Sequence, residues 1–248
     1  MFYSVVVNDW GETTYVPTTL GSVLLIVVIA MLLALATVMA RSFTSRLKAA
    51  KNESDGESAD APSDADKKSS MGKLTAKQLA FCAMALALGT ILSNIKLLEM
   101  PTGGSITLLS MLVICLPGFL YGPAAGFLTC TAYGVLQLVI DPYVLYPMQL
   151  VVDYILAFGS MGVSGFFSKS KNGLIKGYLA AVTARFVFAV ISGWIFFGEY
   201  AWDGWSALPY SLAYNAVYIY AEAAITIIIL LIPAVRKAIS KVVTMARE

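Results

Sequence analysis

Three ionisable side chains lie inside otherwise apolar stretches of this sequence, and they are the residues best placed to do chemistry. They are Asp153, Arg185 and Glu222. A charged side chain costs several kcal/mol in hydrocarbon unless it is paired or reaches water. Asp153 follows Gln149 by one helical turn, and Tyr143 and Tyr146 precede both. A carboxylate below an aromatic entrance is what a site for a cationic or amine-bearing ligand requires.

Asp153 has two interpretations. In the first it binds a ligand from outside, because it lies about 9 Å from the outer end of its predicted helix at about 1.5 Å per residue. In the second it forms a structural ion pair with Arg185. Arg185 begins nearer the cytoplasmic end of its own predicted helix, so the two side chains are expected at different depths. We therefore favour ligand binding.

Polar side chains also recur at every fourth residue of the last apolar stretch, which places them on one helix face. They are Tyr210, Tyr214, Tyr218 and Glu222, with Asn215 beside them. The Asn215 amide offers a donor and an acceptor to the edge of a heterocycle, and an interhelical hydrogen bond is an equally good account. Glu222 lies about 18 Å along the helix from Tyr210. We expect it below the site, paired with Arg185.

Composition excludes several classes of protein. Of 248 residues, 58% are hydrophobic and 13% are charged, about half the charge of a typical soluble domain. The chain has no histidine, which excludes Ser-His-Asp and Cys-His catalysis and His-ligated zinc. It has no Walker A sequence, so it cannot by itself couple ATP hydrolysis to transport. We expect a membrane protein that is not an enzyme, with no catalytic residue, cofactor, metal site or nucleic-acid partner.

Apolar stretches of about 20 residues mark the predicted membrane helices. One extra helix is expected over residues 18–40, and six more form an all-α substrate-binding membrane domain over residues 74–235. These six are expected at about 74–93, 106–121, 123–140, 147–167, 177–197 and 210–235. Residues 1–17 are interpreted as an extracellular N-terminus, 41–73 as a disordered cytoplasmic linker and 236–248 as a cytoplasmic tail.

The charges are distributed unevenly between the two predicted sides of the membrane. Basic residues cluster after residue 40, before residue 78, between 169 and 176, and after 235. The predicted outer side has only Lys96, among Glu99, Asp141, Glu199 and Asp203. Because cytoplasmic loops carry an excess of Lys and Arg, we expect a multi-pass protein in the lipid bilayer of the cell (plasma) membrane. Its N-terminus would lie outside and its C-terminus in the cytoplasm.

Two further features each have a structural and a functional interpretation. Small residues recur at helical spacing in the first of the six helices, at Ala76, Ala80, Ala83 and Ala87. Such a stripe allows close packing of a second helix, either from the same bundle or from a partner subunit. The aromatic segment 194–205, WIFFGEYAWDGW, is either an interfacial girdle or a lid over a bound ring.

Four segments together resemble a known family. They are MPTGGSITLLSML (100–112), QLVVDYILAF (149–158), ISGWIFFGEYA (191–201) and PYSLAYNAVY (209–218). In this order they resemble the thiamine-specific S component, the substrate-binding membrane subunit, of energy-coupling factor (ECF) vitamin transporters. The resemblance implies a protein that captures thiamine from outside. It also implies docking on an ECF module of one transmembrane coupling subunit and two ATPase subunits.

The resemblance also assigns roles to residues. The family's site carboxylate falls on Asp153, and its docking stripe falls on Ala76, Ala80, Ala83 and Ala87. The ligand-binding residues expected from the resemblance and from the patterns above are Asp153, Tyr154, Asn215, Tyr210, Phe197, Tyr143, Tyr146 and Gln149. The family commonly has His where this chain has Ala189 and Trp where it has Phe197.

Other functions fit parts of the pattern. The two departures at Ala189 and Phe197 would suit a related pyrimidine or thiazole precursor. A self-sufficient secondary transporter would need no ATPase. An intramembrane enzyme would use Asp153 and Glu222 as acid and base, although their predicted depths argue against it. A structural membrane protein would need neither Asp153 nor Asn215.

Overall fold

The computed structural model describes residues 3–7, 13–17 and 74–247, and the chain divides into two compact units, Met1–Gly72 and Lys73–Glu248. In the first unit, β1 (Tyr3–Val7) and β2 (Thr13–Pro17) pair antiparallel, with Tyr3 opposite Pro17. The expected membrane helix 18–40 and linker 41–73 lie outside the described residues.

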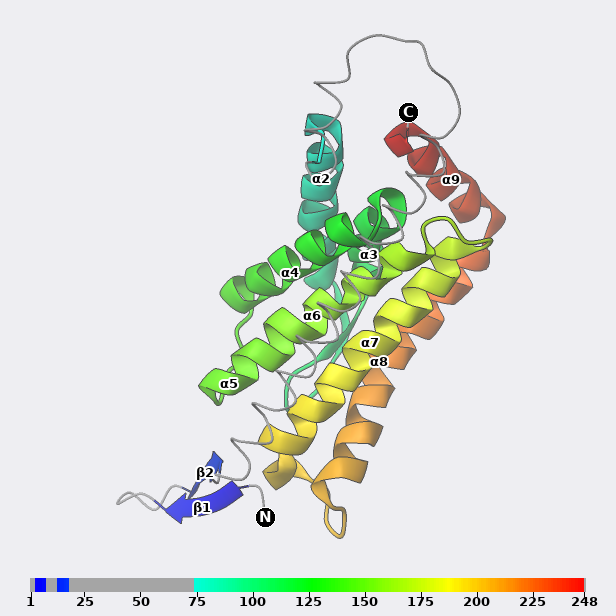
Figure 1. The fold of residues 1–248 in the computed structure, drawn as a ribbon. Coiled ribbons are helices and arrows are strands. Elements are labelled where there is room, and N and C mark those ends of the chain that lie inside the picture. The colour runs from blue at the N-terminus through cyan, green and yellow to red at the C-terminus, as the bar shows by residue number, and fades with distance from the viewer. Residues whose placement is uncertain (1–2, 8–12, 18–73, 248) are drawn as a thin grey trace, which may run out of the picture. The chain divides into compact units, whose positions relative to one another are not determined.

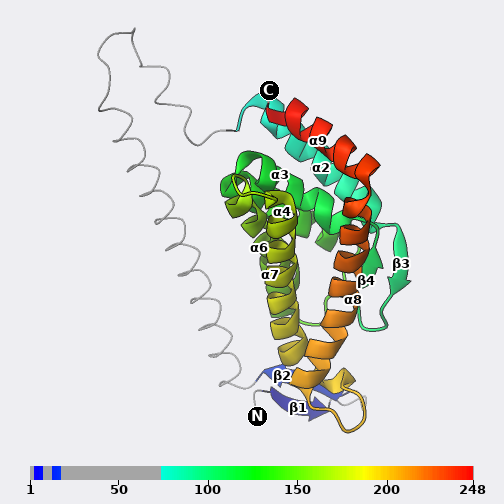
Figure 2. The same ribbon diagram turned by 90° about the vertical axis from the view of Figure 1, so that its right-hand side faces the viewer.

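The second unit is a bundle of apolar helices, which confirms the expected all-α membrane fold (Figure 1). The principal helices are α2 (Ala76–Ser93), α3 (Ser110–Tyr121), α4 (Pro123–Ile140), α7 (Gly173–Phe196) and α8 (Ala207–Leu231), together with a composite helix over 147–167. Helices α7 and α8 lie side by side in both views (Figure 2). A Thr75–Gln78 capping box begins α2, as that pattern favours.

The expected span 106–121 requires a correction. Among the described residues, five helices are long and apolar enough to cross a membrane, and α3 is too short to be one of them. Its 12 residues extend about 18 Å, against about 30 Å of hydrocarbon. The helix begins only at Ser110 because the preceding residues form a strand and because Leu109 has left-handed backbone geometry (φ 64°).

The composite helix changes its winding three times. It comprises α5 (Pro147–Leu150), the π-helical turn η1 (Val151–Leu156), α6 (Ala157–Ser160) and the 3-10 segment η2 (Met161–Phe167). Asp153 lies in the π-helical turn, a feature frequent at functional sites. In η2, a Cβ on Gly162 or Gly165 would lie 2.5 Å from backbone atoms of Phe127 or Pro123. The glycines therefore permit close packing against α4.

A β-hairpin connects α2 to α3. Strands β3 (Lys96–Glu99) and β4 (Ser105–Thr107) pair antiparallel, and the Met100 N–H donates to the Gly104 carbonyl at 2.9 Å. The turn needs glycine because Gly103 and Gly104 have φ values of 85° and 86°. Pro101 and the paired glycines at 103 and 104 are typical of a turn, whereas no pattern in the sequence indicates the strands.

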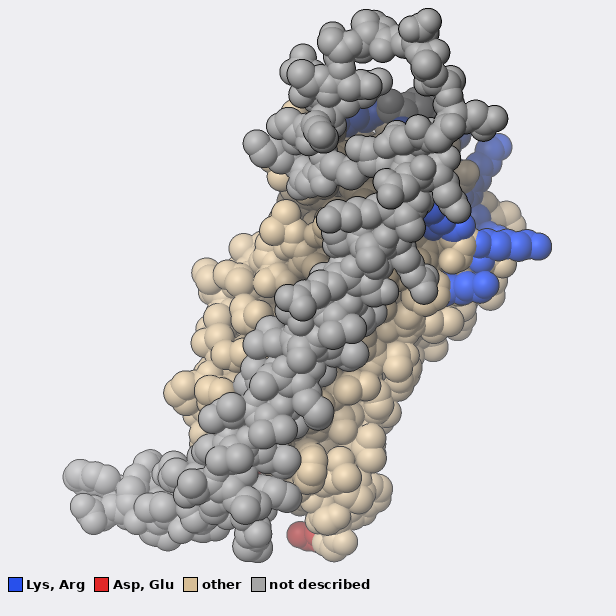
Figure 3. Space-filling model, in the orientation of Figure 1, with Lys and Arg blue, Asp and Glu red and all other residues tan. Residues whose placement is uncertain are grey.

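The last element, α9 (Pro233–Arg247), is a helix that covers most of the expected tail. Its end is fixed on the bundle, because Arg247 Nη2 donates to the Phe119 carbonyl at 3.1 Å and the Tyr121 hydroxyl donates to the Ala246 carbonyl at 3.2 Å. On the face drawn in Figure 3, the visible Lys and Arg side chains gather at one end and the visible acidic residue lies at the other. Between α7 and α8 lies the short 3-10 turn η3 (Gly198–Tyr200).

Candidate functional site

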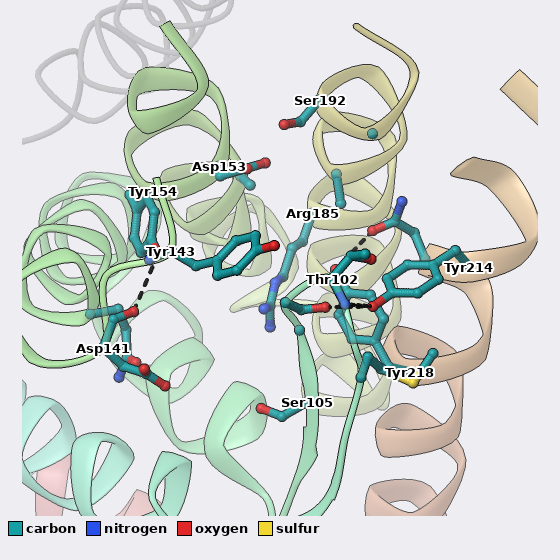
Figure 4. Close-up of a pocket in the computed structure, with 18 of the residues that line it drawn as sticks. Thr102, Ser105, Asp141, Tyr143, Asp153, Tyr154, Arg185, Ser192, Tyr214 and Tyr218 are labelled. Carbon is teal, nitrogen blue, oxygen red and sulfur yellow. Dashed lines mark hydrogen bonds between the residues drawn. The ribbon is translucent and has the colours of Figure 1, made fainter. Parts of the chain in front are cut away.

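A pocket of about 340 Å³ lies within the second unit, between the hairpin, α4, the π-helical turn, α7 and α8 (Figure 4). Its volume is typical of a small-molecule site. The lining extends from exposed side chains such as Lys96 and Asp141 to the buried side chains of Ser192 and Glu222. A ligand at its inner end would therefore be shielded from bulk water.

All three intramembrane charged residues line this pocket, and this corrects the expected position of Glu222. Glu222 was expected below the site and paired with Arg185. Instead, its carboxylate accepts hydrogen bonds from Thr107 N (3.1 Å), Thr107 Oγ1 (2.7 Å), Ser110 Oγ (3.1 Å) and Met111 N (3.2 Å). It therefore satisfies the N–H of the last residue of β4 and an N–H in the first turn of α3, where the helix dipole also favours a negative charge.

Arg185 has a different environment from the one expected. Within the described part of the chain, it forms no ion pair with Asp153 or Glu222, and both ion pairs there involve Lys96. The Arg185 guanidinium carbon lies 4.4 Å from the centroid of the Phe158 ring, a cation–π geometry. Figure 4 shows its side chain extending from α7 into the pocket. The structural Asp153–Arg185 pair considered above is therefore not formed.

Seven of the eight predicted ligand-binding residues line this one pocket, namely Tyr143, Gln149, Asp153, Tyr154, Phe197, Tyr210 and Asn215. They come from three elements, α5, the π-helical turn and α8, and from the segments after α4 and after α7, so the fold brings them together. The eighth, Tyr146, is outside the lining and stacks on Phe196 with ring centroids 5.7 Å apart. Their part in binding remains a prediction.

Two of these seven residues hold the loop after α4. Gln149 is 1% exposed; its Oε1 accepts from Leu145 N (2.7 Å) and its Nε2 donates to the Tyr143 carbonyl (2.9 Å). The Tyr154 hydroxyl accepts from Tyr143 N at 2.7 Å and donates to the Asp141 carbonyl at 3.3 Å. These polar groups fix Tyr143 at the pocket.

The tyrosines that recur at every fourth residue of α8 hold the hairpin turn. The Tyr214 hydroxyl accepts from Thr102 N and donates to the Gly103 carbonyl, both at 2.9 Å. Gly104 packs against Tyr218, because an added Cβ would lie 2.9 Å from that ring. The repeat of four residues was visible in the sequence, but its partner was not, since the turn is more than a hundred residues away.

The Asn215 amide is engaged within its own helix. Its Nδ2 donates to the Ser211 carbonyl (2.8 Å) and to Ser211 Oγ (3.2 Å), while its Oδ1 accepts from the Tyr218 hydroxyl (2.8 Å). One lone pair on Oδ1 remains for a ligand, since a carbonyl oxygen has two. Sequence reasoning missed Ser192 in the lining, because a serine in an apolar helix gives no pattern.

The alanine stripe lies on the outer surface of α2. Ala76, Ala80, Ala83 and Ala87 are all exposed, whereas the buried residues of this helix are Cys82, Ala85 and Gly89. The stripe therefore does not serve packing within the described residues. In the aromatic segment, Trp202 and Trp205 are about half exposed, and Trp202 packs edge-on against Tyr210 with centroids 5.3 Å apart.

An all-α membrane bundle that encloses a polar, aromatic pocket defines the class of protein: a multi-pass membrane protein with an internal site for a small molecule. Residues 79–241 match the family of thiamine transporter proteins (Thia_YuaJ). The chain belongs to this family, which confirms the resemblance noted from its sequence motifs.

Two relatives agree with this assignment. The chain is 36% identical over 167 residues to the thiamine transporter ThiT of Bacillus subtilis, covering 62% of this chain and 86% of ThiT. It also resembles the solved structure of ThiT from Listeria monocytogenes, with a TM-score of 0.53 and 27% sequence identity, over 62% of this chain and 92% of that one. These relatives are transporters, as expected for a protein that is not an enzyme.

Proposed function

We propose that this chain is the thiamine-binding S component of an ECF-type transporter, which captures thiamine from outside and delivers it by docking on an ATPase module. The observation that carries the proposal is the charge of the pocket. Asp153 and Glu222 contribute two carboxylates and Arg185 one guanidinium, so ionised side chains within the membrane-spanning part leave one negative charge. Thiamine carries one permanent positive charge on its thiazolium ring.

Aromatic side chains complete the match to this ligand. Tyr143 and Phe197 both line the pocket and lie nearly parallel, with ring centroids 6.1 Å apart and planes 15° apart. An aromatic face contributes up to about 2 kcal/mol to binding a desolvated cation. A phosphorylated thiamine would bring extra negative charge into a pocket that already has an excess of it, so free thiamine is the better substrate.

Docking on a partner is supported by the outer face of α2. Four alanines form a smooth exposed stripe beside large exposed apolar residues such as Leu79 and Met84. Small residues let a second helix approach closely within a membrane. Because the chain has no Walker A sequence, the energy for uptake would come from the two ATPases of the ECF module, linked through its transmembrane coupling subunit.

The proposed topology follows from charge. The basic residues of α9, Arg236, Lys237 and Lys241, are exposed, as suits the cytoplasmic surface. We therefore propose the plasma membrane as location, with the C-terminus in the cytoplasm and residues 1–17 outside. Residues 18–40 would form the additional membrane helix, followed by a cytoplasmic linker at 41–73.

The test is a thiamine titration of the purified full-length protein, followed by intrinsic tryptophan fluorescence. We expect saturable quenching that is lost in Asp153→Ala, because the pocket then loses a carboxylate whose negative charge complements the positive charge of thiamine. Glu199→Ala, which removes an exposed carboxylate outside the lining, is the matched control and should bind normally. Saturable binding of a pyrimidine or thiazole precursor but not of thiamine would replace the proposed substrate.

Energy coupling needs a separate experiment. Membrane vesicles containing this chain alone should bind thiamine without accumulating it, whereas vesicles that also hold an ECF module and internal ATP should accumulate it. Accumulation by the chain alone would contradict the proposal and identify a secondary transporter. Large substitutions in the stripe, such as Ala83→Trp, should abolish accumulation and leave binding intact.

A further inference from the structure

Ser192 has a buried hydroxyl in the pocket with no hydrogen-bond partner within 3.5 Å among the described residues. It lies on α7, is 1% exposed and lines the pocket, and its Oγ forms no hydrogen bond with any described residue. Serine and threonine within a helix commonly donate to the carbonyl four residues earlier. Thr90 does so in α2, at 2.8 Å from the Leu86 carbonyl, but Ser192 does not. Its hydroxyl is therefore available to a molecule in the pocket.

The side chain of Ser192 is directed at Asp153. Figure 4 shows the two oxygen-bearing groups facing one another from α7 and the π-helical turn. Ser192 is held in place by its neighbours, since Ser211 Oγ donates to the Val190 carbonyl at 2.8 Å and Gly193 leaves room for Ser211 to approach. The Ser192 hydroxyl can turn its hydrogen toward the Asp153 carboxylate, and its oxygen then keeps its lone pairs for an N–H of a molecule in the pocket.

We propose that Asp153 and Ser192 together bind the exocyclic amino group of the aminopyrimidine ring, which makes Ser192 a specificity residue of the site. This inference rests on the proposed function. The amino group has two N–H hydrogens, of which one is donated to the Asp153 carboxylate and the other to Ser192 Oγ. The thiazolium ring has no N–H and cannot satisfy either acceptor.

The remaining polar groups of the pocket favour this assignment. The donors and most acceptors of Asn215, Gln149 and Tyr154 are already hydrogen-bonded within the protein. Arg185 has only donors, so it cannot accept an N–H from the ligand, and its charge repels the thiazolium. Asp153 is the carboxylate of the pocket that the loop before α3 does not occupy, and Ser192 is the buried hydroxyl facing it, so the two offer neighbouring acceptors to one amino group. The thiazolium ring then lies toward the aromatic side chains.

The experiment compares Ser192→Ala with a matched control, Thr129→Val, in the full-length protein. Thr129 also has a buried hydroxyl without a partner, 2% exposed, but it does not line the pocket. We expect Ser192→Ala to weaken thiamine binding by about ten- to a hundred-fold, as loss of one buried hydrogen bond implies. Thr129→Val should bind as the wild type does.

A second ligand locates the effect at the amino group. In oxythiamine an oxo group replaces the amino group, so the two exocyclic N–H donors are absent and only one ring N–H remains. We expect Ser192→Ala to bind oxythiamine about as well as the wild type does. If Ser192→Ala binds thiamine normally, or loses both ligands equally, the inference is wrong. If Ser192→Ala does not fold, Ser192→Cys, which keeps the size and weakens the acceptor, carries the same comparison. Failure of the wild type to bind thiamine would instead refute the proposed function.

Discussion

Replacing Glu222 by glutamine should destabilise the membrane domain, because its carboxylate accepts all four hydrogen bonds that it receives from the segment 107–111 before and at the start of α3. Each carboxylate oxygen accepts from one backbone N–H and one hydroxyl: Oε2 from Thr107, and Oε1 from Met111 and Ser110. In Glu222→Gln one oxygen becomes an NH₂ group. A hydroxyl can rotate to accept from that group, but a backbone N–H cannot. One buried N–H is therefore left facing another donor in either orientation of the amide.

The magnitude follows from these contacts. A buried N–H without an acceptor costs about 1–3 kcal/mol, and the surviving bonds lose the added strength that a charged acceptor provides. Glu222 is 1% exposed, so water cannot compensate. We expect a loss of about 2–4 kcal/mol. For a domain of this size each kcal/mol lowers the melting temperature by about 2–4 °C, which predicts a decrease of about 5–15 °C.

The assay is thermal unfolding of the purified protein in detergent, with Glu199→Gln as the control. Glu199 is exposed, so its amide should change the melting temperature by no more than a degree or two. Hydrogen exchange supplies a local test, because the amides of Thr107 and Met111 should exchange faster in Glu222→Gln alone. A Glu222→Gln protein as stable as the wild type would refute the reasoning that this carboxylate holds the loop.

Two further changes test how the mouth of the pocket is held. Tyr214→Phe removes the hydrogen bonds to Thr102 N and the Gly103 carbonyl, so thiamine should dissociate about ten-fold faster in stopped-flow fluorescence. Tyr220→Phe, at a more exposed ring on the same helix, is the control and should not change the dissociation rate. Equal rates in the wild type and both variants would contradict the role of Tyr214 in holding the hairpin turn. Lys96 donates hydrogen bonds to the carboxylates of Asp141 and Glu99, and these bonds raise the pKa of its ammonium above the ordinary value. The ion pairs therefore stabilise the protein at pH values below the ordinary lysine pKa, and this stabilisation is lost as the pH rises through the raised pKa. Lys96→Met should remove this alkaline loss of stability in melting curves, by less than about 1 kcal/mol because the pair is exposed; an unchanged pH profile would show that the pair contributes nothing.

The helices could be predicted from sequence because a span about 20 residues long in lipid must be apolar and hydrogen-bonded to itself. The expectation was wrong at 106–121 because hydropathy does not distinguish a short helix preceded by a strand from a longer helix. The turn at Gly103 and Gly104 was visible, since only a few residues favour positive φ. The strands beside it were not, because their pairing depends on the register between them.

The candidate site was predictable in part for the same reason. Asp153 and the aromatic residues near it were identifiable because charge in an apolar stretch is costly. The partners of Glu222 were not, since the donors at Thr107 and Met111 reach it only through the fold. Gln149 and Tyr154 line the pocket as expected, yet their hydrogen bonds go to the adjacent loop. The type of a residue alone does not show which of the polar atoms in its side chain remain available to a ligand.

The π-helical turn at Val151–Leu156 makes the site depend on the length of the chain as well as on its residues. An α-helix advances about 100° per residue, and a π-turn accommodates one more residue in that turn than an α-helix does. Deleting a single residue there would restore regular winding and rotate one half of the helix relative to the other. Asp153 and the segment that packs on α4 could then no longer both keep their present directions. A homologue that keeps an acidic residue in this helix but lacks the additional residue would present its carboxylate to a different neighbour.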